Sequence, residues 1–147
     1  MSKTTKNKSA NPGKITWQPG TVLSPVPAVM VTTVGNSGRP NIITIGWAGI
    51  ICSEPPMLSI SVRPERHSYS LLRESGEFAV NIPDRRSVRE TDFCCVVSGR
   101  DCDKFHETGL TQGRSETIKA PIIMECPISI ECKIDREIEL GSHSMFL

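Results

Sequence analysis

Apolar and polar residues alternate strictly in short runs of this chain, and this pattern limits the folds that it can adopt. In the run MLSISVR, residues 57–63, every second residue from Leu58 to Val62 is aliphatic, and the residues between them are serines. Successive side chains of a strand point to opposite faces of a sheet, so this period of two predicts a strand with one buried face. Pro64 directly follows the run and ends it.

Similar runs recur along the chain and are rich in valine, isoleucine and threonine. The segments predicted as strands are 28–35, 41–50, 57–63, 77–83, 126–140 and a last strand that begins within 141–147. Short helices are predicted between them at 66–76, from Asp84 to about Val97, and at 103–109, where capping residues and glycines mark the ends. Short antiparallel strands with helical insertions favour a small barrel.

Length and charge narrow the class of protein. A chain of 147 residues is most simply one domain, and its 17 basic and 16 acidic residues nearly cancel, so we expect no nucleic-acid surface and no membrane surface. The polar, lysine-bearing segment 1–19 predicts a flexible tail and carries no apolar signal sequence, and no run is long enough to span a membrane. These features predict a cytoplasmic protein whose domain spans 20–147.

The chain has 6 cysteines, and none of them forms a C-x-x-C pair. That spacing argues against a zinc ribbon or a redox dithiol, so no metal ligands are assigned and the cysteines are expected to be free thiols. A metal site, or redox sensing through the adjacent Cys94 and Cys95, is a less favoured alternative.

The stretch SISVRPERHS, residues 59–68, predicts an anion site. A strand ends there, and a helix begins near His67 or Ser68 with amide hydrogens that have no partner within the helix. A helix start beside arginine and serine side chains suits phosphate. The alternative is that Arg63 and Arg66 are ordinary solvated charges, and this stretch alone leaves the two interpretations level.

Several motifs in one order resemble a known family. They are NIITIGWAGIICSEPPMLSISVRPERHSYSLLRESGEFAVNIP, then SGRDCDKF, APIIMECPISIECKI and LGSH. Together they resemble the flavin reductase-like proteins of the FMN-binding split-barrel fold, and the flavoredoxins in particular. The resemblance implies a mainly β fold with inserted α-helices, an antiparallel split β-barrel of Greek-key type. It also implies FMN bound without a covalent bond, at or near the interface of a homodimer.

Position by position, the resemblance assigns residues to the cofactor. The flavin-contacting strand would contribute Asn41, Thr44, Trp47 and Ala48, and the phosphate-binding segment Ser61, Arg63, His67 and Ser68. Lys104 matches a basic residue that reaches the cofactor, and His143 matches a position close to the flavin. Taken singly, Trp47 is more often a core or interface residue and His143 a structural one.

The implied function is electron transfer. One hypothesis is an FMN-dependent oxidoreductase that takes hydride from NADH or NADPH and reduces flavin or another acceptor; no catalytic side chain is assigned, because the flavin does the redox chemistry. Alternatives are a flavoredoxin-type electron carrier and a non-catalytic FMN-binding protein. Because an apolar run has just begun where the chain stops, we also expect a form truncated within its closing strand.

Overall fold

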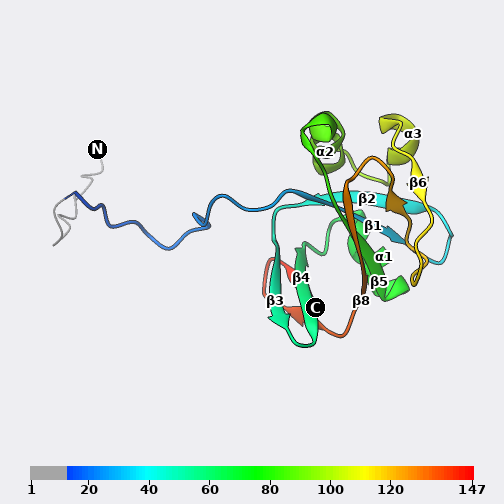
Figure 1. Cartoon of the computed structure of the whole chain (residues 1–147). Coiled ribbons are helices and arrows are strands. Elements are labelled where there is room, and N and C mark those ends of the chain that lie inside the picture. Colours follow the sequence, from blue (N-terminus) through cyan, green and yellow to red (C-terminus); the bar gives the residue numbers. More distant parts are fainter. Residues whose placement is uncertain (1–12) are drawn as a thin grey trace.

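The computed structural model describes residues 13–147 (Figure 1). Residues 1–12, most of the predicted tail, lie outside the described residues. Residues 13–28 contain neither helix nor strand, and they extend away from the body as an arm whose side chains are exposed. The flexibility of the tail stays a prediction.

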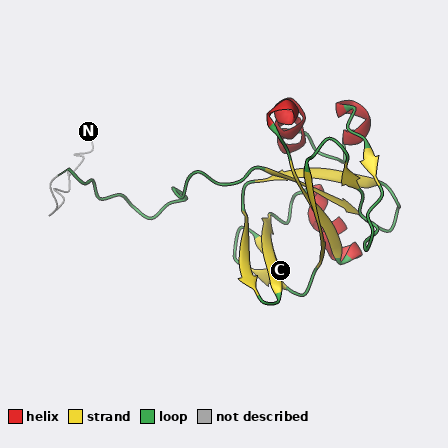
Figure 2. Cartoon of the chain, in the orientation of Figure 1, coloured by secondary structure: helices red, strands yellow, loops and turns green. Residues whose placement is uncertain are grey.

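The body consists of short strands with three helices inserted between them (Figure 2). The strands are β1 Val29–Val34, β2 Pro40–Ile45, β3 Ala48–Ser53, β4 Pro56–Val62, β5 Glu77–Ile82, β6 Gln112–Gly113, β7 Ile122–Ile123, β8 Ile128–Lys133, β9 Glu137–Glu139 and β10 Ser144–Phe146. The helices are α1 His67–Ser75, α2 Val88–Val96, preceded by the single 3-10 turn Arg85–Ser87, and α3 Lys104–Thr108.

Two four-stranded antiparallel sheets make the body. One has the order β2-β1-β5-β8 and the other β3-β4-β10-β9, while β6 and β7 form a small separate pair. The sheets lie across one another without closing into one cylinder, and this arrangement is the predicted split barrel. The prediction of a mainly β, antiparallel fold with inserted helices is therefore confirmed.

Two of the predicted strands are each divided in the structure, and these predictions are corrected. Residues 41–50 break at Gly46 and Trp47, so that β2 belongs to one sheet and β3 to the other. Residues 126–140 divide into β8 and β9 in the same way. A continuous apolar pattern does not show where a strand changes sheets, because strands of both sheets contribute apolar side chains to the main core.

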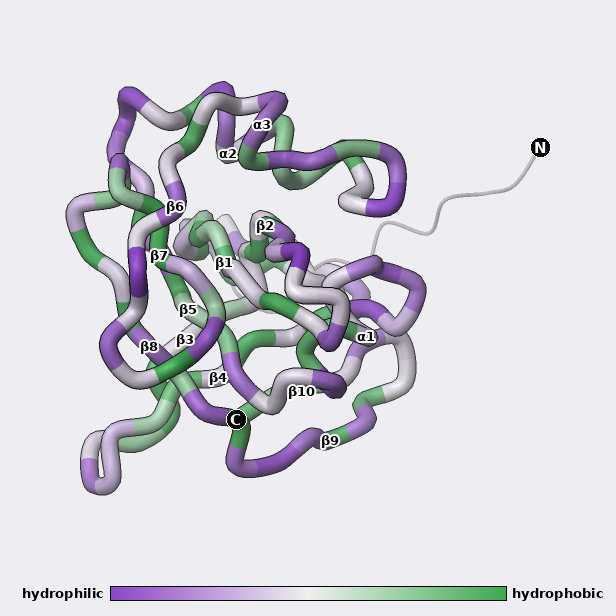
Figure 3. Tube along the Cα trace, turned by 90° about the vertical axis from the view of Figure 1, so that its right-hand side faces the viewer, coloured by the Kyte–Doolittle hydropathy of each residue, from purple (hydrophilic) through white to green (hydrophobic). Residues whose placement is uncertain are grey.

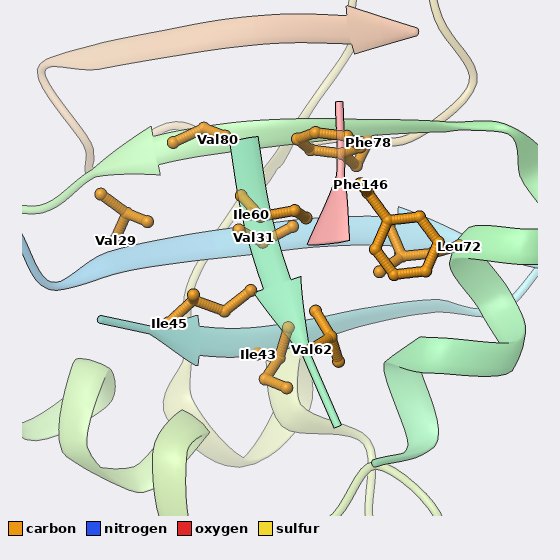
Figure 4. Packing of buried hydrophobic residues seen from close by; sticks show 10 residues of the cluster. All are labelled: Val29, Val31, Ile43, Ile45, Ile60, Val62, Leu72, Phe78, Val80 and Phe146. Carbon is orange, nitrogen blue, oxygen red and sulfur yellow. The ribbon is translucent and has the colours of Figure 1, made fainter. Parts of the chain in front are cut away.

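The main core lies between the two sheets (Figure 4). Ile60 and Val62 of β4 face Val31 of β1 and Phe78 of β5, as the alternation in residues 57–63 predicted. Phe146 of β10 is 1% exposed and packs in the same cluster, so the last strand is part of the core. Whether the chain is a truncated form stays a prediction.

A second core covers the opposite face of β1 and β2. Met30 and Ile42 pack there against Cys94 of α2 and Phe105 of α3, and all four are at least 95% buried. Both faces of this sheet are therefore apolar, which explains the continuous rather than alternating pattern of β1. Figure 3 shows that hydrophilic residues gather along the outer loops. The second core fixes α2 and α3 beside the start of α1.

Within residues 13–147, no helix is both long enough and apolar enough to cross a bilayer. The cytoplasmic location remains a prediction from the sequence.

Candidate functional site

The first turn of α1 presents unpaired amide hydrogens at the end of β4. Its N-cap residue Arg66 makes no capping hydrogen bond with its side chain, and the first turn contains no acidic residue. Ser68 is buried, and Asn41 of β2 donates a hydrogen bond from Nδ2 to its hydroxyl at 2.8 Å. The helix start is therefore held against β2, and its positive end is left without a negative partner from its own turn.

Lys104 carries a buried positive charge beside this helix start. The residue is 4% exposed, and Nζ donates hydrogen bonds to the carbonyl oxygens of Ile42 and Cys94, each at 2.8 Å. An ammonium group has a third hydrogen, and within residues 13–147 no acceptor and no carboxylate partner is found for it. Burial, followed by the charge of Arg66, lowers the pKa of Lys104. Such a charge is stabilised by an anion from outside the protein.

Two arginines lie at the start of α1, close to Lys104. Arg66 donates from a terminal guanidinium nitrogen to the carbonyl oxygen of Cys95 at 2.8 Å, which joins the start of α1 to the end of α2. Arg100 donates to the carbonyl oxygen of Glu65 at 3.0 Å, and this bond draws the loop after α2 over the helix start. Each guanidinium keeps further N–H groups for a ligand.

Gly99 forms the wall of the site. A Cβ atom at this position would collide with the side chain of Asn41 and would lie 2.9 Å from Cδ2 of His67. The loop after α2 can therefore approach β2 and α1 this closely only through a glycine. The missing side chain keeps the backbone tight against the helix start.

These groups enclose a hollow of about 200 Å³, here called the Lys104 hollow. Its lining residues are Asn41, Ile43, Glu65, Arg66, His67, Ser68, Cys94, Cys95, Val97, Ser98, Gly99, Arg100 and Lys104. Burial lowers the pKa of His67, and Arg100, Lys104 and Arg39 lower it further. Whole-ligand pockets measure roughly 300–1,000 Å³, so this hollow suits one phosphate-sized group and not a complete nucleotide.

The structure brings together four of the predicted site residues here: Asn41, His67, Ser68 and Lys104. It adds Arg66, Gly99 and Arg100, which the sequence prediction did not assign. A usable signal was present for the arginines, since Arg66 directly precedes the predicted helix and Arg100 lies in the same SGRDCDKF motif as Lys104.

A second group of predicted residues lies at one end of β4 and β10, the two central strands of the β3-β4-β10-β9 sheet. Ser61 pairs with Met145 of β10, and its amide donates to the carbonyl oxygen of Trp47 at 2.8 Å. The ladder between β4 and β10 ends at Val62 and Ser144. Arg63 and His143, the next residues along each strand, leave the same end of it.

The remaining assignments are spread around these two groups. Ala48 of β3 packs against the main core, and Trp47 is 45% exposed beside it. Arg63 is absent from the residues that line the Lys104 hollow, and its guanidinium lies 3.1 Å from the carboxylate of Glu65. Thr44 donates from its hydroxyl to the carbonyl oxygen of Thr91 at 2.6 Å, a contact that holds α2 on β2.

A larger groove of about 690 Å³ lies elsewhere, between the β3–β4 hairpin and β8. It includes apolar side chains of Ile50, Met57 and Leu58. The cations that line it, Lys133 and Arg136, are accompanied by the carboxylates of Glu131 and Asp135. Because charges of both signs are present, this groove does not favour an anion as the Lys104 hollow does.

Comparison with known proteins places the chain in a family. Residues 21–147 match the model of the flavin reductase like domain. Among solved structures, the chain is similar to flavoredoxin of Desulfovibrio vulgaris (Miyazaki F), with 36% identity and a TM-score of 0.84 over 90% of this chain and 72% of that one. It is also similar to flavoredoxin from Methanosarcina acetivorans, with 29% identity and a TM-score of 0.82 over 90% of this chain and 70% of that one.

A curated relative is a flavin reductase (NADH) of Kitasatospora aureofaciens, which is 27% identical over 84% of this chain and 62% of its own length. The chain spans 62% and 48% of the lengths of two archaeal relatives. The family model covers most of the chain, and the split-barrel architecture agrees with it. We conclude that this chain belongs to the flavin reductase-like family.

Proposed function

We propose that the chain binds FMN without a covalent bond and functions as a flavin reductase-like oxidoreductase. The observation that carries the proposal is the buried ammonium group of Lys104, which has no carboxylate partner among the described residues and faces a hollow of phosphate size. The donors around it are amide hydrogens, guanidinium groups and an ammonium group, a set that suits a dianionic phosphate. FMN would supply the acceptance and donation of electrons.

In this proposal, the protein groups hold and orient the cofactor. Lys104, Arg66 and Arg100 would bind the phosphate, and Ser68 would be positioned by Asn41 at the helix start. The Lys104 hollow is too small for the flavin ring, so the ring would lie outside it, along the segment of Trp47 and Ala48. Arg63 and His143 lie next to the neighbouring ends of β4 and β10, and Ser61 lies within β4. These three residues would approach the ring from that side.

We further propose that the chain forms a homodimer. Trp47, Ile50 and Ile51 are 45%, 76% and 47% exposed, and they follow one another along a single edge strand and the bend before it. Apolar groups clustered in this way mark an interaction surface, and a second copy of the chain would cover them. A ring bound beside Trp47 would then be shielded from water by the partner.

The proposal is tested by titrating the ligand-free protein with FMN and with riboflavin while flavin fluorescence is followed. A phosphate held by charge-assisted hydrogen bonds contributes about 1.5–3 kcal/mol for each such bond, so FMN should bind at least roughly 10-fold more tightly than riboflavin. Equal affinities for the two flavins would remove the phosphate site.

Two arginine variants sharpen the assignment. Arg66→Ala removes a side chain that lines the Lys104 hollow, whereas Arg63→Ala removes an exposed neighbour that is paired with Glu65. We expect Arg66→Ala to weaken FMN binding more than Arg63→Ala does. The opposite order would move the phosphate from the Lys104 hollow to the end of β4.

The electron donor is tested separately by measuring the oxidation of NADH and NADPH by the FMN-loaded protein. Turnover with either nucleotide supports the reductase. Tight FMN binding without nicotinamide oxidation would instead favour an electron carrier of flavoredoxin type.

A further inference from the structure

The cysteines of this chain are free thiols in different surroundings. Burial raises the pKa of three of these thiols to about 11, which keeps them neutral and unreactive near neutral pH: Cys94, Cys126 and Cys132. Cys52, Cys95 and Cys102 are partly exposed and can be reached by a reagent in solution. Of these, Cys95 lines the Lys104 hollow, whereas Cys52 and Cys102 do not.

The surroundings of Cys95, in the last turn of α2, are cationic. Its carbonyl oxygen accepts the hydrogen bond from Arg66 at 2.8 Å. Burial lowers the pKa of Lys104, and the thiol of Cys95, once ionised, acts against this shift, so the two groups lie within electrostatic reach of each other. The carboxylate of Glu65, which also lines the hollow, is paired with Arg63. Reactive cysteines occur in partly exposed, electropositive surroundings of this kind.

The ammonium group of Lys104 gives a second and independent sign of an anion. The residue is 4% exposed, and no acceptor for its third hydrogen is found within residues 13–147. The hollow measures about 200 Å³, which admits one small anion. A group that became negatively charged on Cys95 would therefore find a buried cation ready to bind it.

Oxidation by hydrogen peroxide turns a thiol into such an anion. The thiolate sulfur attacks one peroxide oxygen, the O–O bond breaks, and a sulfenic acid and hydroxide are formed. A further molecule of peroxide oxidises the ionised sulfenic acid to a sulfinate and leaves as water. At each step the sulfur is oxidised and the peroxide oxygen is reduced. The sulfinate spreads its negative charge over its oxygen atoms, as a phosphate does.

We propose that Cys95 is an oxidation site through which peroxide regulates the Lys104 hollow, because its sulfinate would occupy the position of the FMN phosphate. The inference rests on the proposed function and adds a regulation of the same site. The sulfinate and a bound phosphate would compete for the same donors, Lys104 and Arg66. Bound FMN would therefore protect Cys95, and peroxide would convert the ligand-free protein to a form that no longer retains FMN.

The first test follows the oxidation of each cysteine by mass spectrometry after ligand-free protein is treated with hydrogen peroxide. Cys95 should become a sulfinate faster than Cys52, which is partly exposed outside the hollow. Inorganic phosphate at about ten times its dissociation constant should slow the oxidation of Cys95 about 10-fold and leave that of Cys52 unchanged. Equal rates at the two thiols, no protection by phosphate, or a disulfide between Cys95 and Cys102 instead of the sulfinate would overturn the inference.

The second test measures the binding of FMN and riboflavin before and after peroxide treatment in the unaltered chain, Cys95→Ser and Cys52→Ser. In the unaltered chain and in Cys52→Ser, treatment should remove the tighter binding of FMN, a loss of at least roughly 10-fold in affinity. Cys95→Ser should keep the affinities that it had before treatment. A loss of FMN binding in treated Cys95→Ser would assign the effect to another residue and contradict the inference.

A variant with a permanent negative charge makes the result independent of peroxide. Cys95→Asp should weaken FMN binding at least roughly 10-fold and leave riboflavin binding nearly unchanged, with Cys52→Asp as the matched control and a thermal melt to show that both are folded. If FMN binds the untreated chain no more tightly than riboflavin does, the proposed function fails instead. Oxidation of Cys95 that inorganic phosphate suppresses would then still support a thiol that regulates an anion site.

Discussion

The Lys104 hollow and the exposed face of β3 differ in how much of each is buried by the protein chain itself. The hollow is enclosed by three helices and β2, and its central ammonium group is 4% exposed. The face of β3 leaves Ile50 76% exposed and Trp47 45% exposed. A single chain can therefore provide a nearly finished site for a phosphate, whereas the surface proposed for the ring still exposes apolar area to water.

The two regions also differ in what would stabilise them. The Lys104 hollow gains from an anion, since its buried charge has no counter-ion among the described residues. The β3 face gains from any surface that removes Ile50, Ile51 and Trp47 from water. Phosphate binding in the Lys104 hollow and dimer formation through β3 are thus predicted to be separable by substitution.

The largest expected effect is on the dimer, through Ile50→Asp. A charge placed at the centre of a buried apolar interface costs about 2–4 kcal/mol or more, so the dimer dissociation constant should rise roughly 30- to 1000-fold. Sedimentation or light scattering across a concentration series measures it. Val88→Asp is the matched control, because Val88 is 61% exposed on α2, away from β3. A monomeric unaltered chain at micromolar concentration would refute the homodimer.

The next effect in size concerns Lys104→Met, which removes the ammonium group and keeps the apolar stem. The loss of a charge-assisted hydrogen bond of about 1.5–3 kcal/mol should weaken FMN binding roughly 10- to 150-fold and leave riboflavin binding nearly unchanged. Lys119→Met, at an exposed loop position, is the control. A thermal melt shows whether the variant is folded, and unchanged FMN affinity in a folded Lys104→Met protein would contradict the site.

The smallest effect is the pH dependence of FMN binding. Burial lowers the pKa of Lys104 below its ordinary value of about 10.4. As the pH rises, the ligand-free protein therefore loses the Lys104 proton at a lower pH than an exposed lysine would, and it must take up a proton again to bind phosphate. FMN affinity should therefore fall as pH rises between the lowered pKa and about 10.4, by up to ~10-fold per pH unit. FMN titrations at a series of pH values from neutral up to about 10.4 measure this fall.

Two of the groups at the site do not titrate in this window. Burial raises the pKa of the Cys94 thiol to about 11, so it stays neutral there, and the FMN phosphate, with its second pKa at about 6, is already a dianion. The Lys104→Met variant should show no such slope below the pKa of the flavin itself. A slope of the same size in that variant would assign the titration to another group.

Local sequence patterns were sufficient to predict most of the helices and strands. The period of two in residues 57–63 correctly predicted β4 and its buried side chains, because alternation is a property of strand geometry alone. Gly76 and Asp84 correctly predicted a helix end and a helix start, since a left-handed φ of 68° and a capping carboxylate are local requirements. The short pair β6 and β7 carried too few residues for any pattern and was missed.

The features of the candidate site also fall into those that were predictable from the sequence and those that were not. Sequence patterns alone showed that a strand is followed by a helix start flanked by arginines, and the order of motifs indicated the family. The three-dimensional packing was needed to show that Lys104, 37 positions after His67, is buried beside that helix start and donates hydrogen bonds to the carbonyl oxygens of Ile42 and Cys94. It also decided that Arg66 and Arg100 line the hollow while Arg63 turns to Glu65. The physical reason is that charge and hydroxyl content are local properties, whereas burial of a charge depends on which distant elements pack over it.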